Sequence, residues 1–287
     1  MFQLKIDQCL RDEVEALSER LEEMGALSVT LTDRFDSPIL EPEIGTTPLW
    51  ADVVIEAVFT DAEDGQSARS YLETTHPHLH MTLEPVPDKD WERVCMADFK
   101  PQSFGQRLWV CPSWLTPPDP EAVNLILDPG LAFGTGTHPT TSLCLTWLEQ
   151  APLVNQHVID YGCGSGILAL AALKLGASHV TAVDLDSQAL IATRNNAATN
   201  QLPESSLTVS LPVGLQETAD LLIANILLTP LLQLQSEFRR LLKSGGTLVV
   251  SGILNEQVEE LIAAYQHDFK HVVTLQQEDW SLAVFTA

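Results

Sequence analysis

The chain has 287 residues, of which 45% are hydrophobic and 6% aromatic, so it is long and apolar enough for about two folded domains and is not disordered. Its 15 glycines and 17 prolines are near average usage, which excludes a collagen-like or low-complexity chain. The 15 basic and 39 acidic side chains give a net charge of -24, which repels phosphate backbones, so direct nucleic-acid binding is not expected.

The first 86 residues show strand and helix patterns in the order βαββαβ. The predicted strands are Phe2–Ile6, Leu27–Leu31, Ala51–Phe59 and His80–Val86. One predicted helix has apolar residues at spacings of three and four from Val14 to Met24 and ends at Gly25, and a second covers about Glu63 to Thr74. This order predicts a ferredoxin-like α+β domain over residues 1–86, a common platform for binding macromolecules.

Residues 87–120 are rich in tryptophan and proline and are predicted to form a connector with a short helix and a hairpin. From residue 121 to 287 strands alternate with helices, which indicates a mostly parallel sheet covered on both faces. The predicted strands are His157–Asp160, His179–Asp184, Ser206–Ser210, Asp220–Asn225, Thr247–Ser251, His271–Leu275 and Ser281–Thr286. Only residues 276–280 separate the last two, so we expect these two strands to be antiparallel neighbours.

Targeting signals are not evident in the sequence. No run of 18 apolar residues exists, and the N-terminus lacks the basic flank and apolar stretch of a secretory signal. Five cysteines form no CxxC pair, which favours reduced thiols over disulfides or a zinc cluster. We therefore expect a cytoplasmic protein with no membrane span.

A glycine-rich turn follows the strand that begins at His157. The segment from Val158 to Gly166 contains three alternating glycines and leads directly into an apolar helix. Such a turn lets the backbone approach a ligand at a helix N-terminus, although tight packing alone would also explain it. Asp184 ends the next strand, where a carboxylate accepts both hydroxyls of a ribose. Asp186 competes for this role, but its position favours a solvated loop acid.

The glycine spacing distinguishes between two classes of nucleotide-binding enzyme. Dinucleotide enzymes favour GxGxxG, whereas this turn reads DxGxGxG and begins at Asp160. It resembles motif I of the class I S-adenosylmethionine-dependent methyltransferases. That resemblance implies a Rossmann-like seven-stranded sheet with a final inserted strand. It also implies that the glycine loop cradles the methionine part of the cofactor and that the acid after the second strand holds the ribose.

Two further segments indicate which family of class I methyltransferases the chain resembles. They are the stretch from Asp128 to Thr141, which reads DPGLAFGTGTHPTT, and Ala224–Leu227, which reads ANIL. Together with GCGSGILAL and VDLD they resemble the PrmA family, which methylates a large-subunit ribosomal protein, number eleven. The segments Asp88–Trp91 and Phe104–Trp114 are similar to that family too, so the resemblance covers nearly the whole chain. The stretch Arg93–Cys95 departs from the family pattern.

This resemblance implies a cofactor, a substrate and a set of site residues. S-adenosylmethionine is the implied cofactor, and a basic ribosomal protein is the implied substrate, methylated at lysine ε-amines and at its N-terminal α-amine. The N-terminal domain is implied to recognise the substrate, and we expect a monomer. The residues implied to bind the cofactor are Thr141, Gly162, Asp184 and Asn225, with Phe133, Gly164 and Gly166 from the same segments.

Several side chains have a catalytic and a structural interpretation. Asn225 is the predicted catalytic residue, as an acceptor for the hydrogens of the substrate amine, although it could merely cap the following turn. His138 is expected to have a positioning or structural role rather than that of general base. The loop from Phe133 to Thr141 is a candidate lid. Cys163 is expected to be a small filler and not a reactive thiol.

No metal site is expected. His76, His78 and His80 alternate, yet no thiol or acidic fourth ligand lies nearby, which favours a solvated segment. Two other classes of function remain open on the residues alone. A nicotinamide-dependent oxidoreductase is disfavoured by the GxGxG spacing, and a nonenzymatic binding protein with a methyltransferase fold would keep the same motifs.

Overall fold

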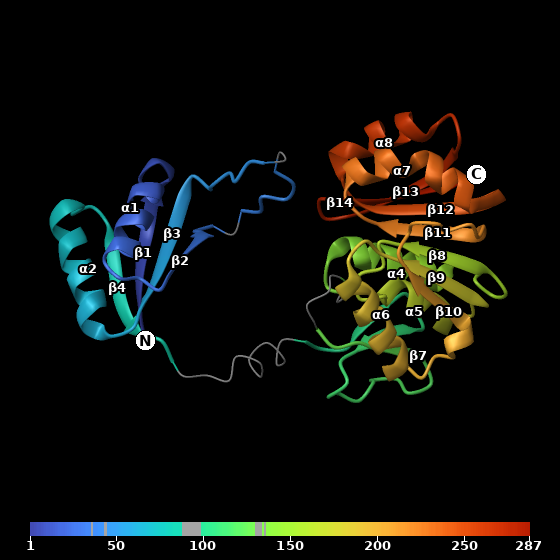
Figure 1. The fold of residues 1–287 in the computed structure, drawn as a ribbon, viewed down its shortest axis with the longest axis horizontal. Coiled ribbons are helices and arrows are strands. Elements are labelled where there is room, and N and C mark those ends of the chain that lie inside the picture. The colour runs from blue at the N-terminus through green and yellow to red at the C-terminus, as the bar shows by residue number, and fades with distance from the viewer. Residues whose placement is uncertain (36, 43–44, 88–98, 130–133, 135) are drawn as a thin grey trace. The chain divides into compact units, whose positions relative to one another are not determined.

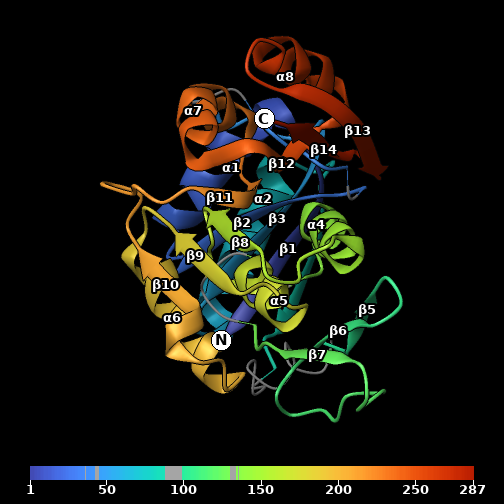
Figure 2. The same ribbon diagram turned by 90° about the vertical axis from the view of Figure 1, so that its right-hand side faces the viewer.

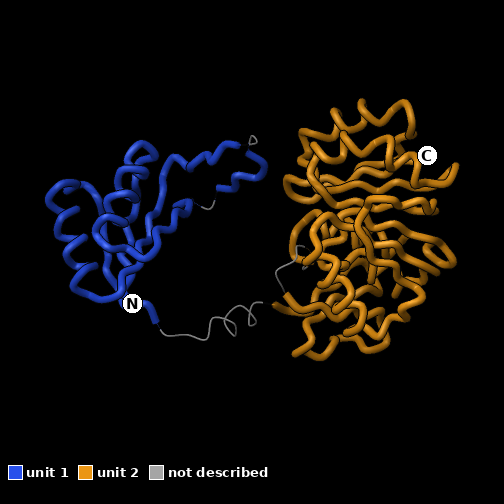
Figure 3. The backbone as a smooth tube through the Cα atoms, in the orientation of Figure 1, with its two compact units in different colours: residues 1–90 blue, residues 91–287 orange. Residues whose placement is uncertain are grey.

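A computed structural model describes residues 1–35, 37–42, 45–87, 99–129, 134 and 136–287. The chain folds into two compact units, residues 1–90 and residues 91–287 (Figure 3). Each unit has its own sheet and its own hydrophobic core.

The first unit is a four-stranded antiparallel sheet packed against two helices. Its elements are β1 (Phe2–Leu10), α1 (Arg11–Glu23), β2 (Ser28–Asp33), β3 (Asp52–Phe59), α2 (Ala62–Thr75) and β4 (His80–Pro85), and the strand order is β2-β3-β1-β4 (Figure 1). Alternate residues such as Leu4 and Ile55 share one core with Leu17 of α1 and Leu72 of α2. The predicted ferredoxin-like order is confirmed. The first strand extends past its predicted end through a bulge between Ile6 and Cys9.

The second unit is built on a seven-stranded mixed sheet. Its strands are β8 (His157–Tyr161), β9 (His179–Val183), β10 (Leu207–Ser210), β11 (Ala219–Asn225), β12 (Leu242–Leu254), β13 (Lys270–Gln277) and β14 (Trp280–Thr286). The order is β10-β9-β8-β11-β12-β14-β13, in which the first five are parallel and β14 is antiparallel to both of its neighbours. The predicted seven strands and the predicted insertion of the last strand are confirmed.

Helices cover both faces of this sheet (Figure 2). One face packs against α4 (Pro139–Gln150), α5 (Ile167–Lys174) and α6 (Ser187–Thr199), and the other against α7 (Leu228–Leu241) and α8 (Val258–Tyr265). Neighbouring residues of β8 point to opposite faces, so Val158 lies in the core under α4 and α5 while Ile159 lies in the core under α7 and α8. Among the described helices, none has the length and apolar character needed to cross a membrane.

A small three-stranded sheet precedes α4. Its strands are β5 (Gln102–Phe104), β6 (Leu108–Cys111) and β7 (Val123–Ile126). β5 and β6 form the hairpin predicted for the connector, and β7, which the sequence did not reveal, pairs in parallel with β6. Arg107 between β5 and β6 joins this sheet to α4 through the buried Glu149 carboxylate, 3.0 Å from Nε. The connector was also predicted to contain a short helix, and none occurs in residues 99–120, the larger described part of it.

Candidate functional site

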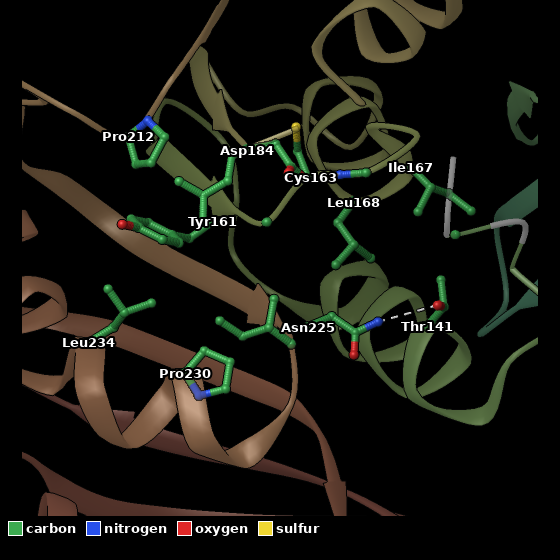
Figure 4. Close-up of a pocket in the computed structure, with 15 residues that line it drawn as sticks. Thr141, Tyr161, Cys163, Ile167, Leu168, Asp184, Pro212, Asn225, Pro230 and Leu234 are labelled. Carbon is green, nitrogen blue, oxygen red and sulfur yellow. Dashed lines mark hydrogen bonds between the residues drawn. The ribbon is translucent and has the colours of Figure 1, made fainter. Parts of the chain in front are cut away.

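The carboxyl ends of β8, β9 and β11 border one pocket of about 350 Å³ (Figure 4). Ligands of open α/β sheets bind at this edge, outside the carboxyl ends of the strands. The volume lies in the range of small-molecule sites. The residues that line the pocket are Gly134, Thr141, Tyr161, Gly162, Cys163, Gly164, Ile167, Leu168, Asp184, Leu185, Pro212, Asn225, Ile226, Pro230 and Leu234.

The glycine loop after β8 folds tightly over the end of β9. The backbone N–H groups of Gly162 and Cys163 both donate to the Val183 carbonyl oxygen, at 2.7 and 3.0 Å. Gly162 has a φ of +84°, and a Cβ added there would lie 2.6 Å from Cγ2 of Ile226. Only glycine fits this position, because a side chain would meet both a strained backbone and the pocket wall. Gly164 also borders the pocket.

Gly166 has a different position from the first two glycines. It is the N-cap of α5, with a φ of +81°, and a Cβ added there would lie 2.8 Å from Cγ2 of Thr193 in α6. It is not among the residues that line the pocket. Tight packing therefore explains the third glycine of the motif, whereas the first two border a cavity.

Asp184 lies directly after β9, at the mouth of the pocket. Its Oδ2 accepts a hydrogen bond from the Gly164 N–H at 2.9 Å, and its Oδ1 accepts one from the Asp186 N–H at 2.9 Å. These two bonds orient the carboxylate and leave further lone pairs on both oxygens. Asp186 instead caps α6 by accepting the Gln188 N–H at 2.8 Å. The structure thus gives the two acids separate positions, with only Asp184 lining the pocket.

Asn225 ends β11 and meets Thr141 from the first turn of α4. The Asn225 side-chain nitrogen donates to Thr141 Oγ1 at 3.3 Å, and Figure 4 shows the amide oxygen pointing away from Thr141. Thr141 is buried, with an exposed fraction of 1%. In this arrangement the Asn225 amide oxygen is left to accept hydrogen bonds from another group.

The segment before α4 is partly described. His138 caps α4 by accepting the Thr140 N–H on Nδ1 at 3.3 Å, and its ring packs edge-on against Trp280, with 4.9 Å between ring centroids. Burial lowers the pKa of His138. This position agrees with the structural role that the sequence favoured. Gly134 lines the pocket, where its carbonyl oxygen accepts the Ser165 hydroxyl at 2.6 Å. Of the predicted lid, Phe133 and Thr135 lie outside the described residues.

Much of the pocket wall is apolar and was not predicted. Its unpredicted members include Tyr161, Leu185, Pro212, Pro230 and Leu234. Leu185 is 81% exposed, although a large apolar side chain gains nothing from facing water. In the sequence, the available signals were an apolar residue directly after the proposed ribose acid and the position of Tyr161 within the glycine motif. Pro230 and Leu234 belong to α7 and Pro212 follows β10, and nothing in their local sequence marks them.

Asp160 is a fully buried carboxyl group beneath the glycine loop. Its Oδ2 accepts the Ala169 N–H at 2.9 Å, and its Oδ1 has no hydrogen-bond partner among the described residues. Burial raises the pKa of Asp160 to about 7, and the nearby charge of Asp184 adds to the rise. Near neutral pH this carboxyl is therefore divided between its protonated and ionised forms.

An Asp160→Asn variant is expected to remove a pH-dependent loss of stability. Because the folded-state pKa lies above the ordinary value of 3.8, the carboxyl stabilises the fold fully below about pH 4 and loses this contribution as the pH rises to about 7. The loss is at most about 4 kcal/mol, at about 1.36 kcal/mol per pH unit. Denaturant unfolding at acidic and at alkaline pH measures it. An identical pH response of wild type and variant would contradict the expectation.

Two other features singled out in the sequence have structural explanations. Burial raises the pKa of Cys163 to about 12, so the thiol is not activated and the interpretation as a filler is supported. His78 pairs with Glu13, 3.0 Å from Nε2 to Oε1, and His76, His78 and His80 do not gather into a metal-binding group within the described part of the chain.

Comparisons with known proteins identify the family. The whole chain, residues 1–287, matches the family model for ribosomal protein L11 methyltransferase (PrmA). The chain belongs to this family. A Legionella pneumophila (strain Corby) relative named ribosomal protein L11 methyltransferase is 62% identical over 286 residues, which span 100% of this chain and 99% of the relative. A Pseudomonas fluorescens (strain SBW25) relative with the same name is 48% identical over 272 residues, 94% of this chain and 93% of the relative.

A solved structure supports the fold of this PrmA family member. The crystal structure of a ribosomal protein L11 methylase from Lactobacillus delbrueckii subsp. bulgaricus matches with a TM-score of 0.60 and 31% identity, over 65% of this chain and 98% of that chain. The resemblance drawn from the sequence motifs is confirmed. The chain is a class I methyltransferase with S-adenosylmethionine as its cofactor, as the sequence predicted.

Proposed function

We propose that this chain transfers methyl groups from S-adenosylmethionine to lysine ε-amines and the N-terminal α-amine of ribosomal protein L11. The observation that carries the proposal is the pocket at the carboxyl edge of the sheet. Asp184 follows β9 and Asn225 ends β11, and these two strands flank β8, so the two residues lie on opposite sides of the glycine loop. The names of the relatives support the substrate.

The lining residues fit a nucleoside that carries an amino-acid tail. The Asp184 carboxylate, already oriented by two backbone N–H groups, is proposed to accept the two ribose hydroxyls. Leu185 and Pro212 offer apolar contact to a flat base. Gly162 and Gly164 leave space for the methionine part, because a side chain at Gly162 would meet the pocket wall.

The other residues proposed to bind the cofactor are Thr141, Asn225, Phe133 and Gly166. Thr141 and Asn225 border the same cavity, and Phe133 belongs to the segment just before Gly134, which lines it. Gly166 contributes indirectly, by letting α5 and the Thr193 side chain of α6 approach closely. The glycines of the motif therefore have two roles: Gly162 and Gly164 leave space for the cofactor, and Gly166 allows the helices to pack closely.

The chemistry requires orientation more than a covalent nucleophile. The cofactor supplies an activated methyl group on a positively charged sulfur, and the amine must be neutral and in line with the S–CH3 bond. Deprotonating a lysine of pKa about 10.4 at neutral pH costs about 4 to 5 kcal/mol, against about 1 for an α-amine. The Asn225 side-chain oxygen, which points away from Thr141, is proposed to accept a hydrogen of the amine and so to aim its lone pair.

Asn225→Ala is expected to lower kcat by about 100-fold while changing the Kd for cofactor far less, because the loss falls on amine orientation. Asn225→Asp is the matched variant, since it keeps the acceptor oxygen but replaces the NH2 group that donates to Thr141 with a second oxygen. We expect it to retain part of the activity. Steady-state methylation and cofactor titration measure the two effects separately. Full activity in Asn225→Ala would assign the residue a capping role only.

The first unit is proposed to bind the basic substrate. Residues 1–90 contain 6 basic and 20 acidic side chains, so much of the negative charge of the chain lies here. The sheet face opposite α1 and α2 has a polar groove lined by Gln3, Lys5, Asp7, Glu56, Thr82 and Glu84. Such a surface attracts positively charged polypeptide segments.

Deletion of residues 1 to about 85 is expected to leave cofactor binding intact and to abolish turnover on the protein substrate. The reason is that the residues that line the cofactor pocket all belong to the second unit, whereas the polar groove proposed to bind the substrate belongs to the first. Cofactor titration and methylation of purified protein L11 measure the two properties. Retained turnover would move substrate recognition to residues 91–287.

Mass spectrometry of purified ribosomal proteins after incubation with enzyme and cofactor tests the function as a whole. We expect mass increases of whole methyl groups on protein L11 alone, located at amines. No increase on any ribosomal protein, despite cofactor binding, would favour a nonenzymatic role. Tight NADH binding without S-adenosylmethionine binding would contradict the proposal.

We further propose that the protein acts as a cytoplasmic monomer without direct contact to nucleic acid. The net charge of -24 opposes binding to phosphate backbones. The four described cysteines are free and buried, which suits a reducing compartment.

A further inference from the structure

A cluster of ionisable side chains lies at the amino ends of β8 and β9, the edge of the sheet opposite the pocket. His157 begins β8, His179 begins β9, and the register pairs these two residues directly. Glu217 comes from the chain just before β11. One ligand atom from each of the three residues lies within 4.8 Å of the others. The length of β8 separates the cluster from the glycine loop by about 13 Å, at about 3.3 Å per residue.

The histidine rings are oriented by backbone carbonyl groups. His157 Nδ1 lies 3.2 Å from the Thr218 carbonyl oxygen, and His179 Nδ1 lies 3.3 Å from the Ser205 carbonyl oxygen. A carbonyl oxygen only accepts, so each Nδ1 carries the hydrogen and each Nε2 of a neutral ring keeps its lone pair. Metal-binding histidines are held in this way, with one N–H on a carbonyl oxygen and the other nitrogen turned to the metal. Here each Nε2 lies 3.0 Å from a threonine hydroxyl oxygen, that of Thr181 for His157 and that of Thr208 for His179, and a bound ion would replace these contacts.

The polar atoms around His157 Nε2 have more acceptor sites than hydrogens to fill them. Nε2 lies 3.0 Å from Thr181 Oγ1 and 3.6 Å from Glu217 Oε2. The Thr181 hydroxyl donates its only hydrogen to Glu217 Oε2, at 3.0 Å. A nitrogen lone pair, a hydroxyl oxygen and a carboxylate therefore face one another with one hydrogen among them. Either a proton on Nε2 or a metal ion would complete the group.

The lysine beside the cluster, Lys243, pairs with a carboxylate other than Glu217. Lys243 is itself neutralised by Asp220, 2.7 Å from Nζ to Oδ1, and Asp220 also accepts the His157 backbone N–H at 2.9 Å. The Glu217 charge is thus left without a cation of its own in this cluster, which a bound divalent ion would supply.

We infer that His157, His179 and Glu217 bind one divalent metal ion with the coordination preferences of zinc. Two imidazoles and one carboxylate form a donor set that zinc accepts, with water as a fourth ligand. Metal–ligand bonds of about 2.0 to 2.2 Å bring donor atoms to roughly 3.4 Å from one another. The Glu217 side chain is 52% exposed and lies outside the strands, so it can make the small approach this requires.

Titration of the metal-free full-length chain with Zn²⁺ alone tests the inference, followed by thermal unfolding with and without Zn²⁺. We expect one equivalent to bind and to raise the Tm. Glu217→Gln and His179→Gln should each weaken binding by about 10-fold or more, which is the effect of losing even an outer contact in a metal site. Thr181→Val is the matched control, because it disrupts the hydrogen-bonded network and keeps all three ligands, so it should retain the Zn²⁺ affinity.

Three outcomes would overturn the site. They are failure of the wild type to bind one equivalent, wild-type affinity in both Glu217→Gln and His179→Gln, and loss of binding in Thr181→Val with retention in Glu217→Gln. Equal binding in all variants would place the ion elsewhere, for example at cysteines. The exposed position of Glu217 makes its glutamine variant structurally mild, and circular dichroism verifies its fold.

Discussion

Replacing Asp184 with alanine is expected to weaken S-adenosylmethionine binding by about 5- to 150-fold, or about 1 to 3 kcal/mol. The variant loses the proposed acceptors of the two ribose hydroxyls. It also releases the Gly164 N–H, which Asp184 Oδ2 holds at 2.9 Å, so the glycine loop loses an anchor at the same time. Isothermal titration of the cofactor into wild type and variant measures the effect.

Asp186→Ala provides the matched control for this experiment. Asp186 stands two residues along the same loop and carries the same charge, but it caps α6 and does not line the pocket. Its loss should cost about 1 kcal/mol of stability and leave cofactor affinity nearly unchanged. If Asp184→Ala bound the cofactor as wild type does, or if both variants lost affinity equally, the ribose could not sit on Asp184.

Gly252→Ala is expected to reduce the free energy of unfolding by about 2 to 5 kcal/mol, from left-handed backbone strain and overpacking together. Gly252 has a φ of +88° and lies where the register of β12 with β14 shifts between Ser251 and Ile253. A Cβ added there would lie 2.5 Å from the carbonyl oxygen of Ile226. That atom belongs to the backbone, so no side-chain rotation relieves the clash. Denaturant unfolding measures the loss.

Gly245→Ala is the control that separates backbone strain from overpacking. Gly245 also has a positive φ, +75°, but no atom lies within 4 Å of an added Cβ. Its alanine variant should therefore lose only the backbone contribution, about 1 to 2 kcal/mol. Because Ile226 lines the pocket, Gly252→Ala should also bind cofactor more weakly, whereas Gly245→Ala should not. Equal stability losses in the two variants would contradict the packing argument.

Most elements of the fold could be predicted because their signals are local. The spacing of Val14, Leu17 and Leu21 marks α1, and these three side chains are buried in the structure. Errors occurred where pairing with a distant partner decides the outcome. Cys9 continues β1 beyond a bulge because β3 offers a partner there, and β7, only four residues long, exists because β6 lies beside it.

The site was predictable to the extent that its residues sit in motifs at strand ends. Gly162 and Asp184 directly follow β8 and β9, Asn225 ends β11, and parallel strands bring their carboxyl ends to one edge. The apolar wall was not predictable, since Pro212 and Leu234 belong to different elements and show no common pattern. The cluster of His157, His179 and Glu217 was also not predicted, because these residues are far apart in the chain and share no short spacing.

By itself, the sequence determined the order of the elements, the turn chemistry of the glycine loop and the acid that follows β9, because each depends on neighbours a few residues away. Only the tertiary structure decided that Thr141 orients the Asn225 amide across 84 positions, and that His157 meets His179 and Glu217. The physical reason is that strand register and helix packing are set by long-range burial of apolar surface, which brings together polar groups that no local pattern connects.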